Sequence, residues 1–93
     1  MFYNIKNELT KYLETAFEKL GLDKADVMVS YSNKPDVADY QCNSAFTLAK
    51  KLGKNPVLVA NEIVEQLGNM NGDFVASVCP PAFINFKMTN SSP

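Results

Sequence analysis

The stretch "PPAFINFKM", residues 80–88, decides the fold of this chain. Its two prolines cannot donate to a β-ladder, so a strand is expected over residues 82–89, with side chains alternating between two faces. One face carries three apolar side chains, those of Ile84, Phe86 and Met88. The other face carries an aromatic ring, an amide and an ammonium, those of Phe83, Asn85 and Lys87. The first face is typical of a core, and the second is a candidate binding surface.

The segments before this strand predict helices early in the chain and strands late. Helices are expected over residues 2–20, 39–52 and 56–67, and further strands over residues 25–31 and 74–79. Glycines 21, 53 and 68 are expected to end the helices, and Asn55 to cap the third one before Pro56. Pro35 marks a loop, and Tyr31 and Leu52 are expected to face the core.

This grouping of elements favours an α+β fold. We expect an antiparallel sheet of three or four strands with about three helices packed on one face and the other face open. Phe83, Asn85 and Lys87 would lie on that open face.

The composition predicts one domain without catalytic chemistry of its own. The 93 residues are 46% hydrophobic and 20% charged, which is typical of a globular domain with a single core. The chain has no histidine, and so lacks the commonest general base and metal ligand. We therefore expect that this chain alone is not an enzyme and holds no cofactor or metal.

Charge and hydropathy restrict the partners of the chain. The net charge of -1 argues against strong autonomous binding of nucleic acid, so any RNA contact must be local, and no DNA partner is expected. No apolar run approaches the ~20 residues of a membrane span, and the charged N-terminal stretch does not resemble a signal peptide, so we expect a cytoplasmic protein. Cys42 and Cys79 have no paired spacing and are expected to be reduced structural thiols.

Three segments taken in order are similar to a known family. They are "DYQCNSAFTLAKKLGKNP" at residues 39–56, "EIVEQL" at 62–67 and "PAFINFKM" at 81–88. They resemble the N-terminal additional domain of bacterial arginyl-tRNA synthetases, which has the patterns Asp-Tyr-Gln-x-Asn, Ala-Lys-Lys-Leu and Gly-Pro-x-Phe-Ile-Asn-Phe. The chain departs from the last pattern at Cys79 and Pro80, which stand where a glycine is usual. The resemblance covers residues 1–89, and residues 90–93 would begin a linker.

The resemblance implies an accessory module that contacts the D-loop at the elbow of tRNA(Arg). It would act in cis with a class I catalytic domain that joins arginine to tRNA using ATP and Mg²⁺. That domain is absent from this chain, because its His-x-Gly-His motif requires histidine. The family's base-contacting aromatic and amide fall on Phe83 and Asn85. For Lys87, a phosphate contact is expected from the strand geometry alone.

Two alternatives stay open at this point. The side chains of "DYQCN" could contact RNA or a neighbouring domain, through Asp39, Tyr40, Gln41 and Asn43. The favoured interpretation is structural: Asp39 caps the following helix, while Tyr40 and Gln41 bond nearby backbone. Lysines 50, 51 and 54 could contact phosphate, but the favoured interpretation is that they are solvated near a helix end, where they suit the helix dipole. The whole module could also pack its open sheet face on a protein partner or another domain, without touching RNA.

Overall fold

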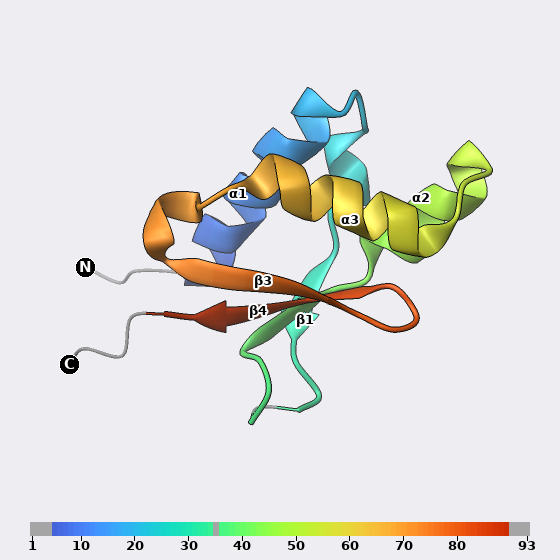
Figure 1. Ribbon diagram of the computed structural model, residues 1–93. Coiled ribbons are helices and arrows are strands. Elements are labelled where there is room, and N and C mark those ends of the chain that lie inside the picture. The colour runs from blue at the N-terminus through green and yellow to red at the C-terminus, as the bar shows by residue number, and fades with distance from the viewer. Residues whose placement is uncertain (1–4, 35, 90–93) are drawn as a thin grey trace.

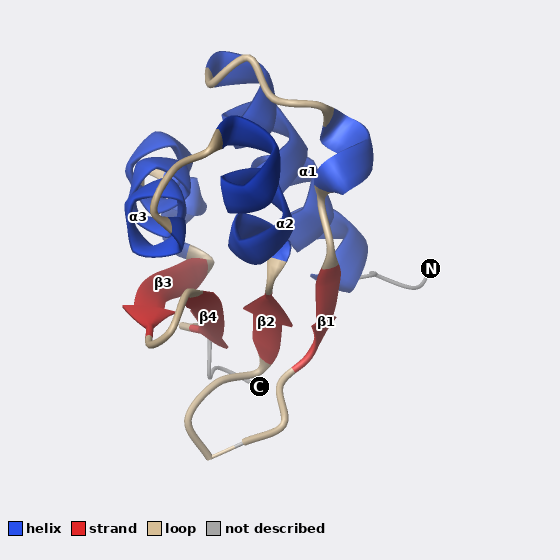
Figure 2. Ribbon diagram, turned by 90° about the vertical axis from the view of Figure 1, so that its right-hand side faces the viewer, coloured by secondary structure: helices blue, strands red, loops and turns tan. Residues whose placement is uncertain are grey.

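The computed structural model describes residues 5–34 and 36–89, which form three α-helices and one four-stranded sheet (Figure 1). The helices are α1 (Ile5–Lys19), α2 (Ser44–Leu52) and α3 (Pro56–Leu67). The strands are β1 (Val29–Tyr31), β2 (Tyr40–Cys42), β3 (Phe74–Cys79) and β4 (Phe83–Met88), and short 3-10 helices span Lys24–Asp26 and Met70–Gly72. All three helices lie on one side of the sheet (Figure 2). The expected α+β architecture with one open sheet face is confirmed.

The helices end where the sequence predicts. After α1, the Leu22 N–H donates to the Phe17 carbonyl at 2.8 Å while Gly21 adopts a φ of 74°, which is a Schellman ending. Gly53 ends α2 in the left-handed region, with a φ of 66°. Before α3, the Asn55 side chain accepts a hydrogen bond from the Val57 N–H at 2.8 Å. Local sequence signals therefore fix the length of the helical layer.

β4 is one of the two inner strands of the sheet, and the longer of them. The strand order is β1-β2-β4-β3, and every neighbouring pair is antiparallel. Phe86 lies opposite Tyr40 on β2 and opposite Ala76 on β3, and its side chain is fully buried with that of Ile84. The predicted alternation of core and outer residues along this strand is thus confirmed.

The core lies between the sheet and the helices. The largest fully buried side chains from the helices are Leu9, Leu13, Phe17, Leu48, Val59 and Ile63. Cys42 from β2 and Ile84 and Phe86 from β4 meet them from the sheet. No helix among the described residues is both long enough and apolar enough to cross a membrane.

The helix expected from residue 39 begins five residues later, and the difference changes the roles of its first residues. Residues 40–42 form β2, in register with both β1 and β4. Asp39 is not the helix cap: its Oδ2 accepts a hydrogen bond from the Met88 N–H at 2.8 Å, and its own N–H donates to the Phe86 carbonyl at 2.9 Å. Asn43 occupies the capping position of α2, without a side-chain capping bond. Pairing with a distant strand overrides the local helical pattern here.

Other boundaries also differ from expectation. The strand expected over residues 25–31 is only Val29–Tyr31, because Asp23 caps a 3-10 turn by accepting from the Ala25 N–H at 2.9 Å. Leu52 was expected to face the core, and this is wrong, because it is 47% exposed. Tyr31 does lie on the core side of the sheet, opposite Tyr40, but on the edge strand β1 it stays 70% exposed. The predictions for Phe2, Pro35 and residues 90–93 lie outside the described residues.

Phe86→Ala should strongly destabilise the domain. The ring is fully buried at the centre of the sheet, so its removal leaves a cavity that costs about 3 to 5 kcal/mol of the ~5 to 10 kcal/mol expected in total. Val75→Ala on β3 is the matched control, since Val75 is 55% exposed on the open face and its loss should change stability by under about 0.5 kcal/mol. Thermal and urea melts compare the two variants. Equal losses would contradict the assignment of faces.

Asp39→Ala should weaken the junction of β2 and β4. The variant leaves the Met88 N–H without its carboxylate acceptor, at a cost of about 1 to 3 kcal/mol. Asp39→Asn keeps an acceptor oxygen and should lose less. Asp36→Ala, an exposed carboxylate in the same loop, is the control. Urea melts and hydrogen exchange at the Met88 amide measure the effect, and unchanged exchange in Asp39→Ala would exclude this role.

Candidate functional site on the open sheet face

A row of polar side chains crosses the open face of the sheet. Gln41 on β2 lies opposite Asn85 on β4, and Asn85 lies opposite Ser77 on β3. At the other edge, Ser30 on β1 lies opposite Gln41. Residues directly opposite one another in a sheet point to the same face, so these four side chains form one row. The open face therefore offers hydrogen-bonding groups across its whole width.

A hollow of about 280 Å³ lies beside this row. Gln41 and Asn85 line it from the sheet. The β3–β4 hairpin contributes Cys79, Pro80 and Phe83, and the β1–β2 loop contributes Ser32, Asn33, Lys34 and Val37. Lys34 is the only charged group among the described residues that line the hollow. Such a site suits a flat polar group that carries a negative charge nearby.

Phe83 at the rim of the hollow is half-buried, which differs from the fully solvated ring that the alternation alone would give. Its ring meets that of Phe46 on α2 nearly edge-on, with centroids 5.1 Å apart and ring planes at 70°. The contact holds the Phe83 ring in place. The rest of its surface stays available to a ligand in the hollow.

The Asn85 amide is oriented by a neighbouring thiol. Its Nδ2 donates a hydrogen bond to the Cys79 sulfur at 3.0 Å. Among the described contacts the amide oxygen has no hydrogen-bond partner, so it can accept a bond from a ligand. Both cysteines are free thiols, Cys42 buried and Cys79 half-buried.

The loop that faces the hairpin is braced by its own hydrogen bonds. The Lys34 N–H donates to the Ser32 hydroxyl at 3.0 Å, and the Lys34 carbonyl accepts from the Val37 and Ala38 N–H groups at 2.9 and 3.1 Å. The Ser32 N–H donates to the Asp39 carbonyl at 3.2 Å. Figure 2 shows this loop, between β1 and β2, projecting away from the helical layer.

The structure gathers three of the seven sequence-predicted site residues in the hollow, namely Phe83, Asn85 and Gln41. The other four lie elsewhere. Lys87 is exposed on the open face outside the hollow, Tyr40 is buried on the core face, Asp39 joins β2 to β4, and Asn43 is exposed before α2.

Sequence reasoning missed the contribution of the loop, above all that of Lys34. Pro35 had marked a loop at this point, but no local signal shows which face of the sheet a loop will border. The polar side chains at positions 30 and 77 were also missed, because the register that aligns them with Asn85 depends on pairing between distant strands.

Tyr40 is a structural residue on the core side. Its ring stacks on that of Tyr31 with centroids 5.5 Å apart, and the Lys6 ammonium lies 5.6 Å from the Tyr31 ring centroid. Burial raises the pKa of Tyr40 above its usual value of 10.0, with smaller contributions from Tyr31 and Asp39. Tyr40 is therefore a neutral phenol at physiological pH and supplies no charge to the site.

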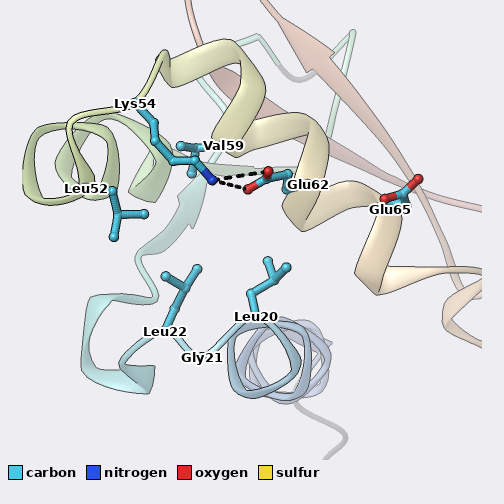
Figure 3. Close-up of a pocket in the computed structure, with 8 residues that line it drawn as sticks. All are labelled: Leu20, Gly21, Leu22, Leu52, Lys54, Val59, Glu62 and Glu65. Atoms are coloured by element: carbon cyan, nitrogen blue, oxygen red, sulfur yellow. Dashed lines mark hydrogen bonds and ion pairs between the residues drawn. The ribbon is translucent and has the colours of Figure 1, made fainter.

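A second, larger hollow of about 590 Å³ lies among the helices, where Leu20, Leu22 and Leu52 line it (Figure 3). An ion pair between Lys54 and Glu62, 3.3 Å apart, crosses its upper side. Lys51 pairs likewise with Asp26 at 2.9 Å, so two of the three lysines near the end of α2 already have carboxylate partners. No cluster of metal-ligating side chains occurs in the part of the chain that the structure describes.

The comparison with family models and the comparison with curated proteins agree on one family. Residues 4–88 match the model of the family described as the arginyl tRNA synthetase N terminal domain. An arginine–tRNA ligase of Hyphomonas neptunium is 36% identical over 89 residues, which is 96% of this chain and 15% of that protein. One from Alkaliphilus oremlandii is 33% identical over 84 residues, which is 90% of this chain and 14% of that protein. The chain thus spans about one seventh of these relatives.

Solved structures share the fold. The crystal structure of arginyl-tRNA synthetase from Plasmodium falciparum matches with a TM-score of 0.80 at 23% identity, over 91% of this chain and 16% of that one. The structure of the Thermus thermophilus arginyl-tRNA synthetase matches with a TM-score of 0.77 at 24% identity, over 91% of this chain and 14% of that one. With the family match over residues 4–88, the chain belongs to the arginyl-tRNA synthetase N-terminal domain family.

Proposed function

We propose that this chain is the tRNA-binding accessory domain of an arginyl-tRNA synthetase and contacts the D-loop at the elbow of tRNA(Arg). The observation that carries the proposal is the hollow, which gathers Phe83, Asn85 and Gln41 on the open sheet face without a lining carboxylate. Membership of the family supports the same role. The catalytic domain in the same polypeptide would carry out aminoacylation in the cytoplasm, and ATP and Mg²⁺ would bind there.

The chemistry of the hollow suits one unpaired base. An aromatic ring stacks on any base and contributes about 1 to 3 kcal/mol, whereas the amides of Asn85 and Gln41 can bond to base edges. Asn85 enters such a contact with one N–H already held by Cys79, so its free oxygen is pre-oriented. Lys87, exposed on the same face, would contact a phosphate beside the base.

A second candidate function rests on exposed apolar side chains of the same face. Val75 on β3 and Val37 in the β1–β2 loop are 55% and 56% exposed, which favours packing of the open face on another domain or protein. The salt dependence of binding distinguishes the two functions. RNA contacts weaken steeply as the salt concentration rises, whereas an apolar protein interface hardly changes.

The isolated 93-residue chain should bind a tRNA(Arg) transcript weakly, with a dissociation constant from roughly high micromolar to 1 mM, the latter equivalent to about 4 kcal/mol. One stacked base and a few polar contacts would not give a higher affinity. Tethering to a synthetase that already holds tRNA supplies an effective concentration on the order of millimolar, which makes such a site useful. When the transcript is added in an NMR titration, the side-chain amide signals of Gln41 and Asn85 should shift. The shifts should be smaller at high salt. Nanomolar affinity, or shifts confined to the helical layer, would refute the proposal.

Phe83→Leu and Phe46→Leu form a matched pair of variants. Both lose the same ring contact, worth about 0.5 to 1.5 kcal/mol, and both should melt a few degrees lower. Only Phe83→Leu removes the ring from the hollow, and in the full-length synthetase it should reduce kcat/KM for tRNA about five- to a hundredfold. Asn85→Ala should have a similar but milder effect. If charging kinetics fall equally in Phe83→Leu and Phe46→Leu, the loss comes from stability and the RNA role of Phe83 is excluded.

A further inference from the structure

We propose that Ser32, Asn33, Lys34 and Val37, which line the hollow from the β1–β2 loop, form the second half of the RNA site, and that Lys34 binds a backbone phosphate of the nucleotide whose base enters the hollow. The inference rests on the proposed function and extends it to a segment outside the motifs "DYQCN" and "PAFINFKM". It assigns a charge contact to the loop and leaves base recognition to the sheet and the hairpin.

The first argument is the charge distribution around the hollow. All nine basic residues of the chain are lysines, and several are already engaged. Three of them form ion pairs: Lys24 with Glu18, Lys51 with Asp26, and Lys54 with Glu62. A fourth, Lys6, lies over the Tyr31 ring. Lys34 is exposed, lines the hollow and makes no ion pair among the described residues. Its ammonium is thus available to an anion where a ligand would sit.

The second argument is the hydrogen bonding of the backbone at Lys34. Its N–H and its carbonyl both have partners within the loop, the Ser32 hydroxyl on one side and the Val37 and Ala38 amides on the other. The loop in turn is joined to the sheet through the Ser32 N–H and the Asp39 carbonyl. A side chain on a braced backbone loses less conformational entropy on binding than one on a mobile loop.

The third argument is the size and lining of the hollow. Its volume of about 280 Å³ lies just below the roughly 300 to 1,000 Å³ of pockets that enclose drug-sized ligands. It therefore accepts one flat group rather than an extended molecule. Apolar side chains line it from both sides, Phe83 from the hairpin and Val37 from the loop. If the base lies between Phe83 and Val37, its phosphate stays outside the hollow. There the exposed ammonium of Lys34 can reach it and act as a point charge.

The test compares Lys34→Gln with Lys50→Gln. Lys50 is an exposed lysine in the last turn of α2 and is not among the residues that line the hollow. Binding of each 93-residue variant to the tRNA(Arg) transcript is followed by NMR titration over a series of salt concentrations. One lost phosphate contact should make the slope of log K against log salt less steep by about 0.7 to 0.9. At low salt, Lys34→Gln should bind about two- to fivefold more weakly, and Lys50→Gln should match the parent.

The salt slope distinguishes a phosphate contact from a structural role, because a merely distorted loop would weaken binding without changing the slope. Melting temperatures should be the same for parent and variants, since Lys34 is exposed. Suppose that the NMR signals of Asn85 shift in the parent, and that Lys34→Gln has the same slope of log K against log salt as the parent. That result would overturn this inference and leave the proposed function standing. A parent that shows no shifts at the hollow would overturn both.

Discussion

The arrangement of the sheet, and of the two faces that it presents, depends on the double pairing of β4. This strand bonds to β2 along one edge and to β3 along the other, so its register fixes both neighbours at once. The same six residues supply Ile84 and Phe86 to the core and Phe83 and Asn85 to the hollow. A slip by one residue would exchange these sets, bury an amide and expose two large apolar side chains. Stability and the proposed binding would therefore be coupled through a single strand, and the junction at Asp39 holds its far end to β2.

The sequence predicted those parts of the structure that depend on local signals. Asn55, Gly53 and Gly68 stand at helix ends because capping and positive φ are properties of a few adjacent residues. The face assignment of β4 was also correct, since a period of two is visible in six residues. Residues 40–42 were assigned to a helix because the pattern that follows them is helical and their strand partners are distant in the sequence. Lys34 was missed for a related reason: the position of a loop over a sheet depends on the fold of the whole chain.

In the proposed function, the site would assist a larger binding event. It has a half-buried ring, amides on the sheet and one lining cation, set in a protein of net charge -1. The chain has no arginine, so no planar guanidinium fork is present for bidentate recognition, and its lysines would act on phosphate as point charges. In the proposed function, discrimination would come from the fit of a base against Phe83, Asn85 and Gln41. Such an arrangement would give modest affinity, and the net negative charge would disfavour the binding of unrelated nucleic acids.

The strand order has a consequence for synthesis on the ribosome. β2 lies beside β4 in space, yet α2, α3 and β3 all come between them in the sequence. While these elements emerge, β1 and β2 can pair only with each other, and a pair of three-residue strands is too short to persist alone. The helices likewise lack the sheet face that covers their apolar sides. We therefore expect that no part of the nascent chain folds stably by itself, and that the domain folds as one unit after its last strand has left the exit tunnel.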